Sequence, residues 1–448
     1  MMRVLAAIAL LALPMSAFAA EPEALRKLDA ELSAIVADPA RALASLSVLA
    51  MRGGRVVYER QFGRRFIDEA NPANSRAADA QTTYRIASIT KLVTALGVLR
   101  LAEKGMLSLD ADIGTYLGYA VRNPHFPRTA ITLRMLLAHT SSLRDDADYV
   151  FPPGHEMREF LVPGGKAYGS GAMWSAKAPP GSYFAYCNLN SGVIATIMEK
   201  ATGERFDRLM RRLVLEPLGM RGGFNPAEMT PAQVNHIATL YRKAREVGGK
   251  ELWDPRGPWV AQVDDYSEKP PVNRAGSDYR IGSNGALFGP QGNLHASVED
   301  LSRVMRMLAG RGVIDGKRFL GARTVEAMLA RHWKSDGGAN GEIDYGSQLG
   351  LHQAWGLGNQ QFVDAGRPAW GDRLVEGAAF GAIGHLGEAY GLHGAFLVDP
   401  ATGNGIIYLA GGTAFDPESD PGEYSAFHRY EERILTAVYR RALQDQAD

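Results

Sequence analysis

Residues 85–105 read RIASITKLVTALGVLRLAEKG, an apolar helical segment with a serine at its start and a lysine three residues later. Residues three apart lie on the same face of a helix, so Ser88 and Lys91 are expected to point the same way. Gly105 is well suited to end the helix in the left-handed conformation. Lys91 is either a surface residue whose ammonium reaches solvent or the base that takes a proton from Ser88, and the rest of the chain has to decide.

A Ser-x-x-Lys pair at a helix start has a chemical use. A serine hydroxyl becomes a useful nucleophile only with a base nearby, and a desolvated lysine can lose its proton and serve as that base. The helix N-terminus adds a backbone dipole that favours negative charge developing there. About one such spacing is expected by chance in a chain of this length, so the pair alone establishes nothing.

Tyr186 and Asn188 form a second candidate, in the segment PPGSYFAYCNLNSG at residues 179–192. A tyrosine near a lysine ammonium can act as a base or proton relay, and an asparagine two residues on can hold that lysine or a substrate carbonyl. Taken alone, the pattern fits better an aromatic side chain packed at a helix start beside a capping asparagine. Cys187, between them, is more typical of a small buried residue than of a nucleophile.

His385 and Gly387 form a third candidate, in AIGHLGEAYGLHGAFLVDP at residues 382–400. On a strand, His385 faces one side of the sheet, and Gly387 would let a substrate backbone approach closely. A single histidine beside glycines is more often structural than catalytic, so this motif also needs support from the others.

Together, the three motifs resemble those of the penicillin-recognising serine hydrolases, a family that includes class C β-lactamases, DD-peptidases of the same branch, and the related family VIII esterases and D-aminopeptidases. Further blocks occur in the family's order between about Val48 and Gly412. The blocks are YRIASITKLVTALGVLRLAEKGMLSLD, ITLRMLLAHTSSL, PPGSYFAYCNLNSGVIATIMEKATGERF, LEPLGM, GNLHASVEDLSRV and GHLGEAYGLHGAFLVDPATG. This conjunction favours Lys91 as the partner of Ser88.

The resemblance implies a role for each motif residue. Ser88 would be the nucleophile that forms an acyl-enzyme, and Lys91 and Tyr186 would share the general-base role. Asn188 would position the substrate amide or ester and support Lys91. His385 would replace the lysine more usual in β-lactamases. Deacylation would use a water molecule activated by Tyr186.

The third motif also implies part of the binding site. The backbone N–H groups of Ser88 and Glu388 would form the oxyanion hole, where loss of one donor typically costs about 2.7–4 kcal/mol. β-Lactamases and many DD-peptidases carry a hydroxyl residue in the middle of this motif, which binds the substrate carboxylate, and here Leu386 stands instead. Leucine cannot hydrogen-bond an anion. If Leu386 occupies the homologous position, an ester, or an amide whose carboxylate is bound elsewhere, becomes more plausible than a β-lactam.

The resemblance implies an α/β fold of the α+β type, the β-lactamase/transpeptidase-like fold. An antiparallel sheet flanked by helices would come from residues 21–105 and 290–448, and a mainly helical domain with an irregular active-site rim from residues 106–289. Local patterns agree, with helical spacing at residues 23–36 and a hairpin that turns at Gly53-Gly54.

Other segments give further expectations. Residues 241–292 are rich in Pro, Gly and Asn and are expected to be irregular, as a rim over the pocket. The spacing after Asn188 predicts two helices broken at Gly203, and another helix is capped by Ser297. The chain is expected to end in an amphipathic helix over residues 423–444.

The overall composition excludes several classes of partner. The 448 residues include 49 basic and 49 acidic side chains, so no net charge favours nucleic acid as a partner. Cys187 is the single cysteine, which excludes an internal disulfide and a cysteine-rich zinc site. The sequence has no phosphate-binding Gly-x-x-x-x-Gly-Lys loop, no His-Glu-x-x-His and no Gly-x-Ser-x-Gly. We therefore expect no cofactor and no metal.

Residues 1–20 have the features of a signal peptide. A positive charge at Arg3 precedes an apolar run, and small residues before and at Ala19 and Ala20 predict cleavage near that point. The run is too short for a stable membrane span, and no second long apolar run follows. We expect a periplasmic or secreted protein without a transmembrane segment.

Two classes of function remain. The first is an exported serine hydrolase that acts through Ser88 on a small-molecule or peptide substrate. It would cleave an ester or an amide bond, and peptidoglycan-derived peptides are among the candidate substrates. A class C-like β-lactamase is the alternative within this class. The second is a non-catalytic protein that binds penicillin or peptidoglycan. Intact Ser88, Lys91, Tyr186 and Asn188 favour the enzyme, because a retired site has no chemical reason to keep all four. The oligomeric state, and which of Lys91 and Tyr186 takes the first proton, stay open.

Overall fold

The computed structural model describes residues 22–276 and 278–444. The predicted signal peptide, residues 1–20, therefore lies outside the described residues. Among the described residues, no helix is both long and apolar enough to span a lipid bilayer.

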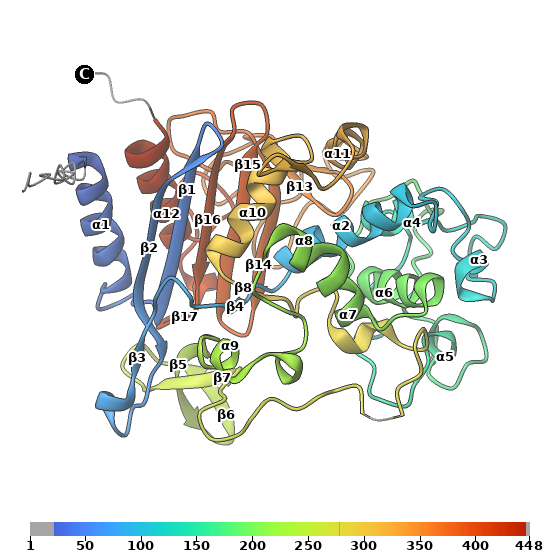
Figure 1. Ribbon diagram of the computed structural model, residues 1–448, viewed down its shortest axis with the longest axis horizontal. Coiled ribbons are helices and arrows are strands. Elements are labelled where there is room, and N and C mark those ends of the chain that lie inside the picture. The colour runs from blue at the N-terminus through green and yellow to red at the C-terminus, as the bar shows by residue number, and fades with distance from the viewer. Residues whose placement is uncertain (1–21, 277, 445–448) are drawn as a thin grey trace, which may run out of the picture.

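The largest sheet in the described part of the chain has nine strands, and all neighbouring strands are antiparallel. Its order is β11-β12-β13-β14-β15-β16-β1-β2-β3, so strands from the beginning and the end of the chain lie side by side (Figure 1). Leu46 of β1 pairs with Ala410 of β16. The strands are β1 (Ser45–Arg52), β2 (Arg55–Phe66), β3 (Arg76–Ala77), β11 (Trp333–Lys334), β12 (Ala354–Trp355), β13 (Gln360–Phe362), β14 (Ala382–Ala389), β15 (Leu392–Asp399) and β16 (Asn404–Ala410).

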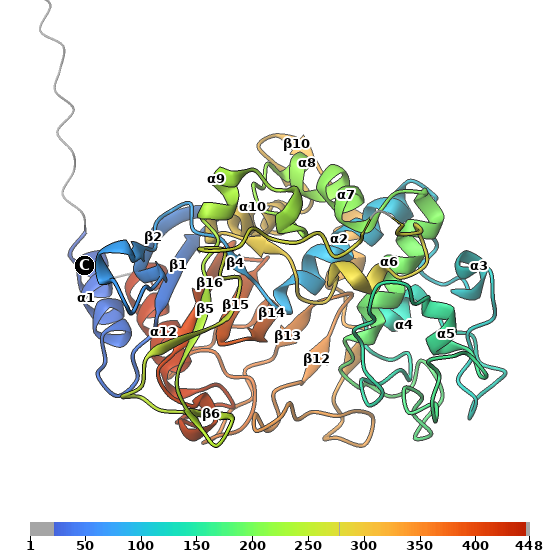
Figure 2. The same ribbon diagram turned by 90° about the horizontal axis from the view of Figure 1, so that it is seen from below.

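Helices cover both faces of this sheet because its strands are apolar on both sides. Val48 packs in the cluster that contains α1 (Glu23–Val36) and α12 (Arg429–Val438), whereas its neighbour Leu49 packs in the cluster that contains α2 (Ile89–Glu103) and α10 (Val298–Ala309). Successive residues of a strand point to opposite faces, which explains this division. Figures 1 and 2 show α1 and α12 lying together beside the sheet. The expected antiparallel sheet flanked by helices is confirmed.

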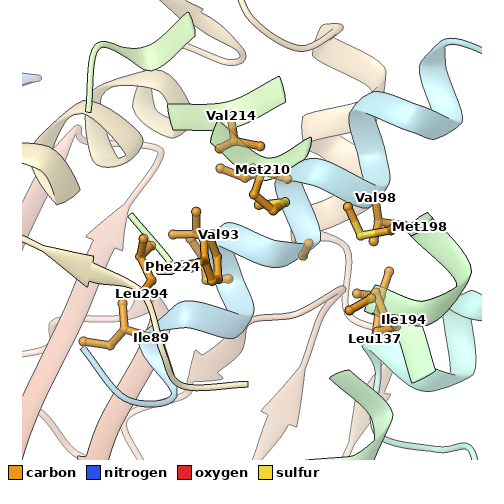
Figure 3. Close-up of a cluster of buried hydrophobic side chains, with 14 of the residues drawn as sticks. Ile89, Val93, Val98, Leu137, Ile194, Met198, Met210, Val214, Phe224 and Leu294 are labelled. Atoms are coloured by element: carbon orange, nitrogen blue, oxygen red, sulfur yellow. The ribbon is translucent and has the colours of Figure 1, made fainter. Parts of the chain in front are cut away.

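Helix α2 is buried on nearly all sides. Every residue from Ile89 to Leu99 is buried, and Figure 3 shows the apolar side chains that surround the helix, among them Phe224 beside Val93 and Met198 beside Val98. A helix that is apolar all round belongs in a protein core. A lysine in its first turn therefore has no surface to reach.

The helical part of the chain lies at the end of the molecule away from α1 (Figures 1 and 2). As predicted, the helix after Asn188 ends at Gly203, which has φ +69°. The helices here are α3 (Gly114–Leu117), α4 (Leu133–Leu137), α5 (Met157–Leu161), α6 (Leu189–Thr202), α7 (Phe206–Met210) and α8 (Glu216–Leu218). Helix α9 (Pro231–Asn235) lies instead in the half of the molecule that contains the large sheet (Figures 1 and 2). Outside this region, α11 spans Ala322–Leu329. Two pairs of short strands complete this part: β4 (Tyr84–Arg85) pairs with β8 (His295–Ala296), and β9 (Val313–Ile314) pairs with β10 (Lys317–Arg318).

The expectation that residues 241–292 are irregular is wrong for their first part. The chain forms β5 (Leu240–Val247), β6 (Lys250–Trp253) and β7 (Trp259–Val263), and β17 (Gly412–Thr413) pairs with β5 in parallel. The turn between β5 and β6 is Gly248-Gly249, with φ +60° and +77°, the same hairpin signal as at Gly53-Gly54. The described residues between Val263 and Gly285 form neither helix nor strand.

The C-terminal helix also begins later than predicted. α12 starts at Arg429 rather than at residue 423. The Glu432 carboxylate accepts hydrogen bonds from the backbone N–H groups of Glu423 and Tyr424 at 2.7 and 3.1 Å, which fixes these residues in a turn before the helix. The spacing of apolar residues in 423–428 could not reveal these hydrogen bonds to Glu432.

Candidate active site

Ser88 lies where the chain passes from β4 into α2. The preceding residue, Ala87, has φ +45°, a left-handed conformation that costs a non-glycine residue about 1–2 kcal/mol. The turn is held by the backbone of Leu294, whose carbonyl accepts from the N–H of Ile86 at 2.9 Å and whose N–H donates to Thr90 Oγ1 at 3.3 Å. This sharp turn places the Ser88 hydroxyl at the N-terminus of a buried helix.

Lys91 is 5% exposed, so it is not a surface lysine. Its Nζ lies 2.8 Å from Ser88 Oγ, 2.7 Å from Asn188 Oδ1 and 3.1 Å from the Gln291 carbonyl oxygen. Burial lowers the pKa of Lys91 from 10.5 to about 7, although the negative charge of Asp145 acts to raise it. A substantial fraction of Lys91 is therefore a neutral amine near pH 7.

The three partners of Lys91 match what a neutral amine offers. A neutral amine has two N–H groups and one lone pair, whereas an amide or carbonyl oxygen can only accept a hydrogen bond. The oxygens of Asn188 and Gln291 take the two N–H groups, so the lone pair is left for the hydroxyl hydrogen of Ser88. This arrangement is suited to removing a proton from Ser88.

The Tyr186 ring lies between two histidines. It stacks on His139 with ring centroids 4.6 Å apart and on His352 at 5.4 Å, and Lys91 Nζ is 4.9 Å from its centroid. Burial raises the pKa of Tyr186 well above its usual value, and the nearby Ser88 hydroxyl only partly opposes this rise. Tyr186 is therefore a protonated phenol at neutral pH. His352 was not singled out from the sequence.

Asn188 is held by Asp145, a residue that the sequence analysis missed. The Asp145 carboxylate accepts from Asn188 Nδ2 at 2.9 Å, from the backbone N–H groups of Asn188 and Leu189 at 2.8 and 2.9 Å, and from Cys187 Sγ at 3.3 Å. It thus caps α6 and turns the Asn188 amide so that Oδ1 faces Lys91. No local pattern marks Asp145, because it lies in a loop far from α6 in sequence.

Replacing Asp145 with asparagine should shift the pH dependence of turnover. The negative charge of Asp145 acts to raise the pKa of Lys91, so its loss lowers that pKa further, and the midpoint of activity should move to lower pH. The variant should also lose about 1–3 kcal/mol of stability, because several donors lose their acceptor. Asp146→Asn is the control, since Asp146 is exposed and pairs with Arg144. An unmoved midpoint in Asp145→Asn would refute the electrostatic role.

His385 is a neutral hydrogen-bond acceptor rather than a substitute for a lysine cation. It is 2% exposed, and burial lowers its pKa to about 3. Its Nδ1 lies 2.6 Å from the Leu386 carbonyl oxygen, which can only accept, so Nδ1 carries the hydrogen. Nε2 then has a free lone pair, and this buried atom has no hydrogen-bond partner among the residues that the structure describes.

A glycine is needed at position 387 because the chain passes close to the turn before Ser88. A Cβ atom here would lie 2.5 Å from the Ile86 carbonyl oxygen and 3.3 Å from Ile89 Cγ1. The absence of a Cβ atom therefore allows β14 to approach the turn before Ser88 closely.

Gly387→Ala should move this turn. We expect a loss of about 1–3 kcal/mol in the free energy of unfolding, because the clash is with rigid backbone, together with reduced turnover. Gly381→Ala is the matched control, since its Cβ would meet only the Phe362 carbonyl oxygen, at 3.8 Å. Thermal unfolding and ester hydrolysis measure both effects, and equal behaviour of the two variants would contradict this account.

The inference drawn from Leu386 is wrong in its geometry. Leu386 pairs with Ala395 across the sheet and packs against the cluster under α1 and α12. His385 and Leu386 are neighbours on one strand, so their side chains point to opposite faces. Leu386 does not line the Ser88 cavity.

The Ser88 cavity has a volume of about 380 Å³. Of the predicted site residues, Ser88, Asn188 and Glu388 line it, whereas Lys91, Tyr186 and His385 lie behind these. Ser88 and Glu388 line the same cavity, as the predicted oxyanion hole requires. The cavity is lined by Arg85, Ala87, Ser88, Tyr149, Val150, Phe151, Pro152, Pro153, Asn188, Arg274, Ala286, Leu287, Gly289, Gln291, Gly292, Asn293, Tyr345, Glu388, Ala389 and Tyr390.

Two other features compete with this cavity for a functional role. A cavity of about 500 Å³ lies between the loops at residues 226–239 and 264–271, but none of the predicted site residues lines it. His393, His428 and Glu431 have possible metal-binding atoms within 4.8 Å of one another, on the α12 side of the sheet. The Glu431 carboxylate already accepts from Tyr408 and from the His428 backbone. Neither feature places a nucleophile beside a base.

Comparisons with known proteins identify a family for the chain. The family model described as Beta-lactamase matches residues 25–428. Esterase EstB from Burkholderia gladioli is 27% identical over 406 residues, which cover 85% of this chain and 89% of the esterase. Penicillin-binding protein 4* from Bacillus subtilis (strain 168) is 28% identical over 205 residues, which cover 44% of this chain and only 41% of that protein.

A solved structure supports the fold. The Beta-lactamase/D-alanine Carboxypeptidase from Yersinia pestis, complexed with citrate, superposes with a TM-score of 0.60 at 18% identity and covers 93% of this chain and 98% of its own. The match of the family model over most of the chain, together with this fold, leads to one conclusion: the chain belongs to the Beta-lactamase family of serine hydrolases.

Proposed function

We propose that the chain is an exported serine hydrolase that forms an acyl-enzyme on Ser88 and cleaves an ester or an amide. The observation that carries the proposal is the contact of Lys91 Nζ with Ser88 Oγ at 2.8 Å, combined with the lowering of the Lys91 pKa to about 7. A base of this pKa is half deprotonated at the pH where its proton transfer is most useful.

In this proposal Lys91 takes the first proton. Its lone pair faces the Ser88 hydroxyl, whereas Tyr186 is a protonated phenol and cannot act as a base in the resting enzyme. Ser88 Oγ attacks the substrate carbonyl while its proton moves to Lys91 Nζ. The oxyanion accepts hydrogen bonds from the backbone N–H groups of Ser88 and Glu388.

Collapse of the tetrahedral intermediate releases the alcohol or amine, which takes a proton from the cationic Lys91 or, through it, from Tyr186. A water molecule then attacks the acyl-enzyme, and its proton returns along the same route. Asn188 and Gln291 keep Lys91 Nζ in place throughout, because both oxygens bind it as an amine and as an ammonium.

Ester cleavage is favoured over β-lactam cleavage by two observations. The match to esterase EstB extends over 85% of the chain, whereas the match to penicillin-binding protein 4* covers 44%. The neutral His385 also offers no positive charge to the carboxylate that penicillins carry. A class C-like β-lactamase and a non-catalytic binding protein are the competing proposals.

Intact-mass spectrometry of the protein, incubated separately with a penicillin and with a p-nitrophenyl ester, tests the proposal. We expect ester turnover that requires Ser88 and no lasting penicillin adduct. A stable, Ser88-dependent penicillin adduct would favour a peptidoglycan peptidase or sensor. Absence of reaction with both reagents would favour the binding protein. Export is tested by the mass of the protein recovered from the periplasm or medium, which should correspond to cleavage near Ala19 or Ala20.

A further inference from the structure

Two histidines and a glutamate converge on the face of the large sheet that lies opposite to α2. His393 belongs to β15 and points to the same side as Ala395, which packs in the cluster under α1 and α12. His428 is the N-cap residue of α12, and Glu431 lies in the first turn of that helix. The possible ligand atoms of these three side chains lie within 4.8 Å of one another.

The Glu431 side chain is a buried acid without a cationic partner. Glu431 is 5% exposed, and it forms no ion pair with any residue that the structure describes. Two hydrogen bonds hold its carboxylate, one from the Tyr408 hydroxyl at 2.6 Å and one from the backbone N–H of His428 at 3.1 Å. Buried charges in proteins are paired or bind metal ions. Each carboxylate oxygen keeps a second lone pair for such an ion.

The two imidazole rings beside Glu431 are available as ligands. Their centroids are 5.4 Å apart and their planes are almost perpendicular, at 80°. Neither ring nitrogen of His393 forms a hydrogen bond with a residue in the described part of the chain. The backbone N–H of Glu431 donates to the His428 carbonyl at 3.0 Å, so it does not need the His428 ring as its acceptor. Both rings can therefore direct a lone pair to the space beside the carboxylate.

This donor set fits a zinc ion. Zinc binds imidazole nitrogen and carboxylate oxygen, and two histidines with one acidic residue are among its common ligand groups. Ligand atoms about 2.1 Å from zinc lie about 3.4 Å from one another in a tetrahedron, so small side-chain rotations close the present group around an ion. Glu388 pairs with His393 across β14 and β15 and is exposed, which places the group close to solvent. An ion can enter from that side, and a water molecule can fill the fourth position.

We propose that His393, His428 and Glu431 bind a zinc ion that joins β15 to the start of α12. The ion neutralises the buried carboxylate and stabilises the packing of the C-terminal helix on the sheet. The site lies outside the Ser88 cavity, so this inference does not depend on the proposed hydrolase function. The expectation of no metal rested on short sequence motifs, and this group has none, because only the fold brings His393 to the other two residues.

The test is the zinc content of the purified protein, prepared without a histidine tag and measured by inductively coupled plasma mass spectrometry. After incubation with zinc and removal of unbound ions, we expect one zinc ion per chain. Chelation with dipicolinate should lower the melting temperature by about 2–5 °C, and zinc should restore it, because an ion that binds only the folded chain stabilises it. His393→Gln should weaken zinc binding at least about 100-fold, since even residues that only orient a ligand are worth 10- to 100-fold.

His125→Gln is the matched control, because His125 is an exposed histidine in a loop outside this group, and its loss should leave the zinc content unchanged. The melting temperature of His393→Gln should no longer respond to zinc or to dipicolinate, whatever the stability of the variant itself. This response separates loss of the ion from a general loss of packing. A zinc content close to zero in the intact protein, or full retention of zinc by His393→Gln, would overturn the inference.

Discussion

Replacement of Ser88 by alanine is expected to lower kcat/KM for a p-nitrophenyl ester by at least about ten-thousandfold, while the protein stays folded. Alanine has no oxygen to attack the carbonyl, so no acyl-enzyme can form. The buried residues around α2 are unchanged by the loss of one hydroxyl, and the melting temperature should stay within a few degrees.

The Ser88→Ala experiment needs a control for general effects of a serine-to-alanine change. Ser182 serves, because it is exposed and donates its hydroxyl only to the Pro179 carbonyl. A folded Ser88→Ala protein that retained more than a tenth of the activity would contradict the proposed nucleophile. Reduced activity in Ser182→Ala would show that a serine-to-alanine change can lower activity without removing the nucleophile.

Lys91→Met should reduce turnover nearly as much as Ser88→Ala, because nucleophile and base act as a unit and their losses are not additive. Methionine fills a similar volume and suits a buried helix, which keeps the variant folded. A double variant with both changes should be no worse than either single one. Additive losses would mean that Lys91 acts independently of Ser88.

The intact enzyme should show the titration of Lys91 directly. Only neutral Lys91 can take the Ser88 proton, and its pKa is lowered to about 7, so kcat/KM should rise with pH through about 7 and level off above it. His352 and His385 do not contribute to this limb, because their pKa values are lowered to about 4 and 3. A profile that is flat between pH 5.5 and 8.5 would contradict Lys91 as the base.

The sequence pointed to residues that the structure brings together around Ser88, because these residues lie in short motifs. Ser88 and Lys91 are one helical turn apart, and Tyr186 and Asn188 flank a single residue, so local spacing is enough to pair them. Asp145 and His352 reach the site from loops and show no periodicity. They become visible only when the fold brings distant segments together.

Two errors had local causes that the sequence contained. Strand alternation places the Leu386 side chain on the face of β14 opposite to His385, so the two side chains are not expected to face the same cavity. Gly248-Gly249 is the same hairpin signal as Gly53-Gly54, and the Pro and Gly content of the following loop obscured it. The order of the sheet, in contrast, depends on pairing between the two ends of the chain, for which a single sequence carries no signal.

The position of β1 between β2 and β16 has a consequence for how the molecule is made. β1 emerges early from the ribosome, but the partner on its other side is one of the last strands to be synthesised. Until then the backbone N–H and C=O groups on the free edge of β1 have no partner strand. Pairing β1 with β16 requires the closure of a very long loop. The sheet can therefore be completed only late in synthesis, and an unpaired β1 edge before that point would favour aggregation of the nascent chain.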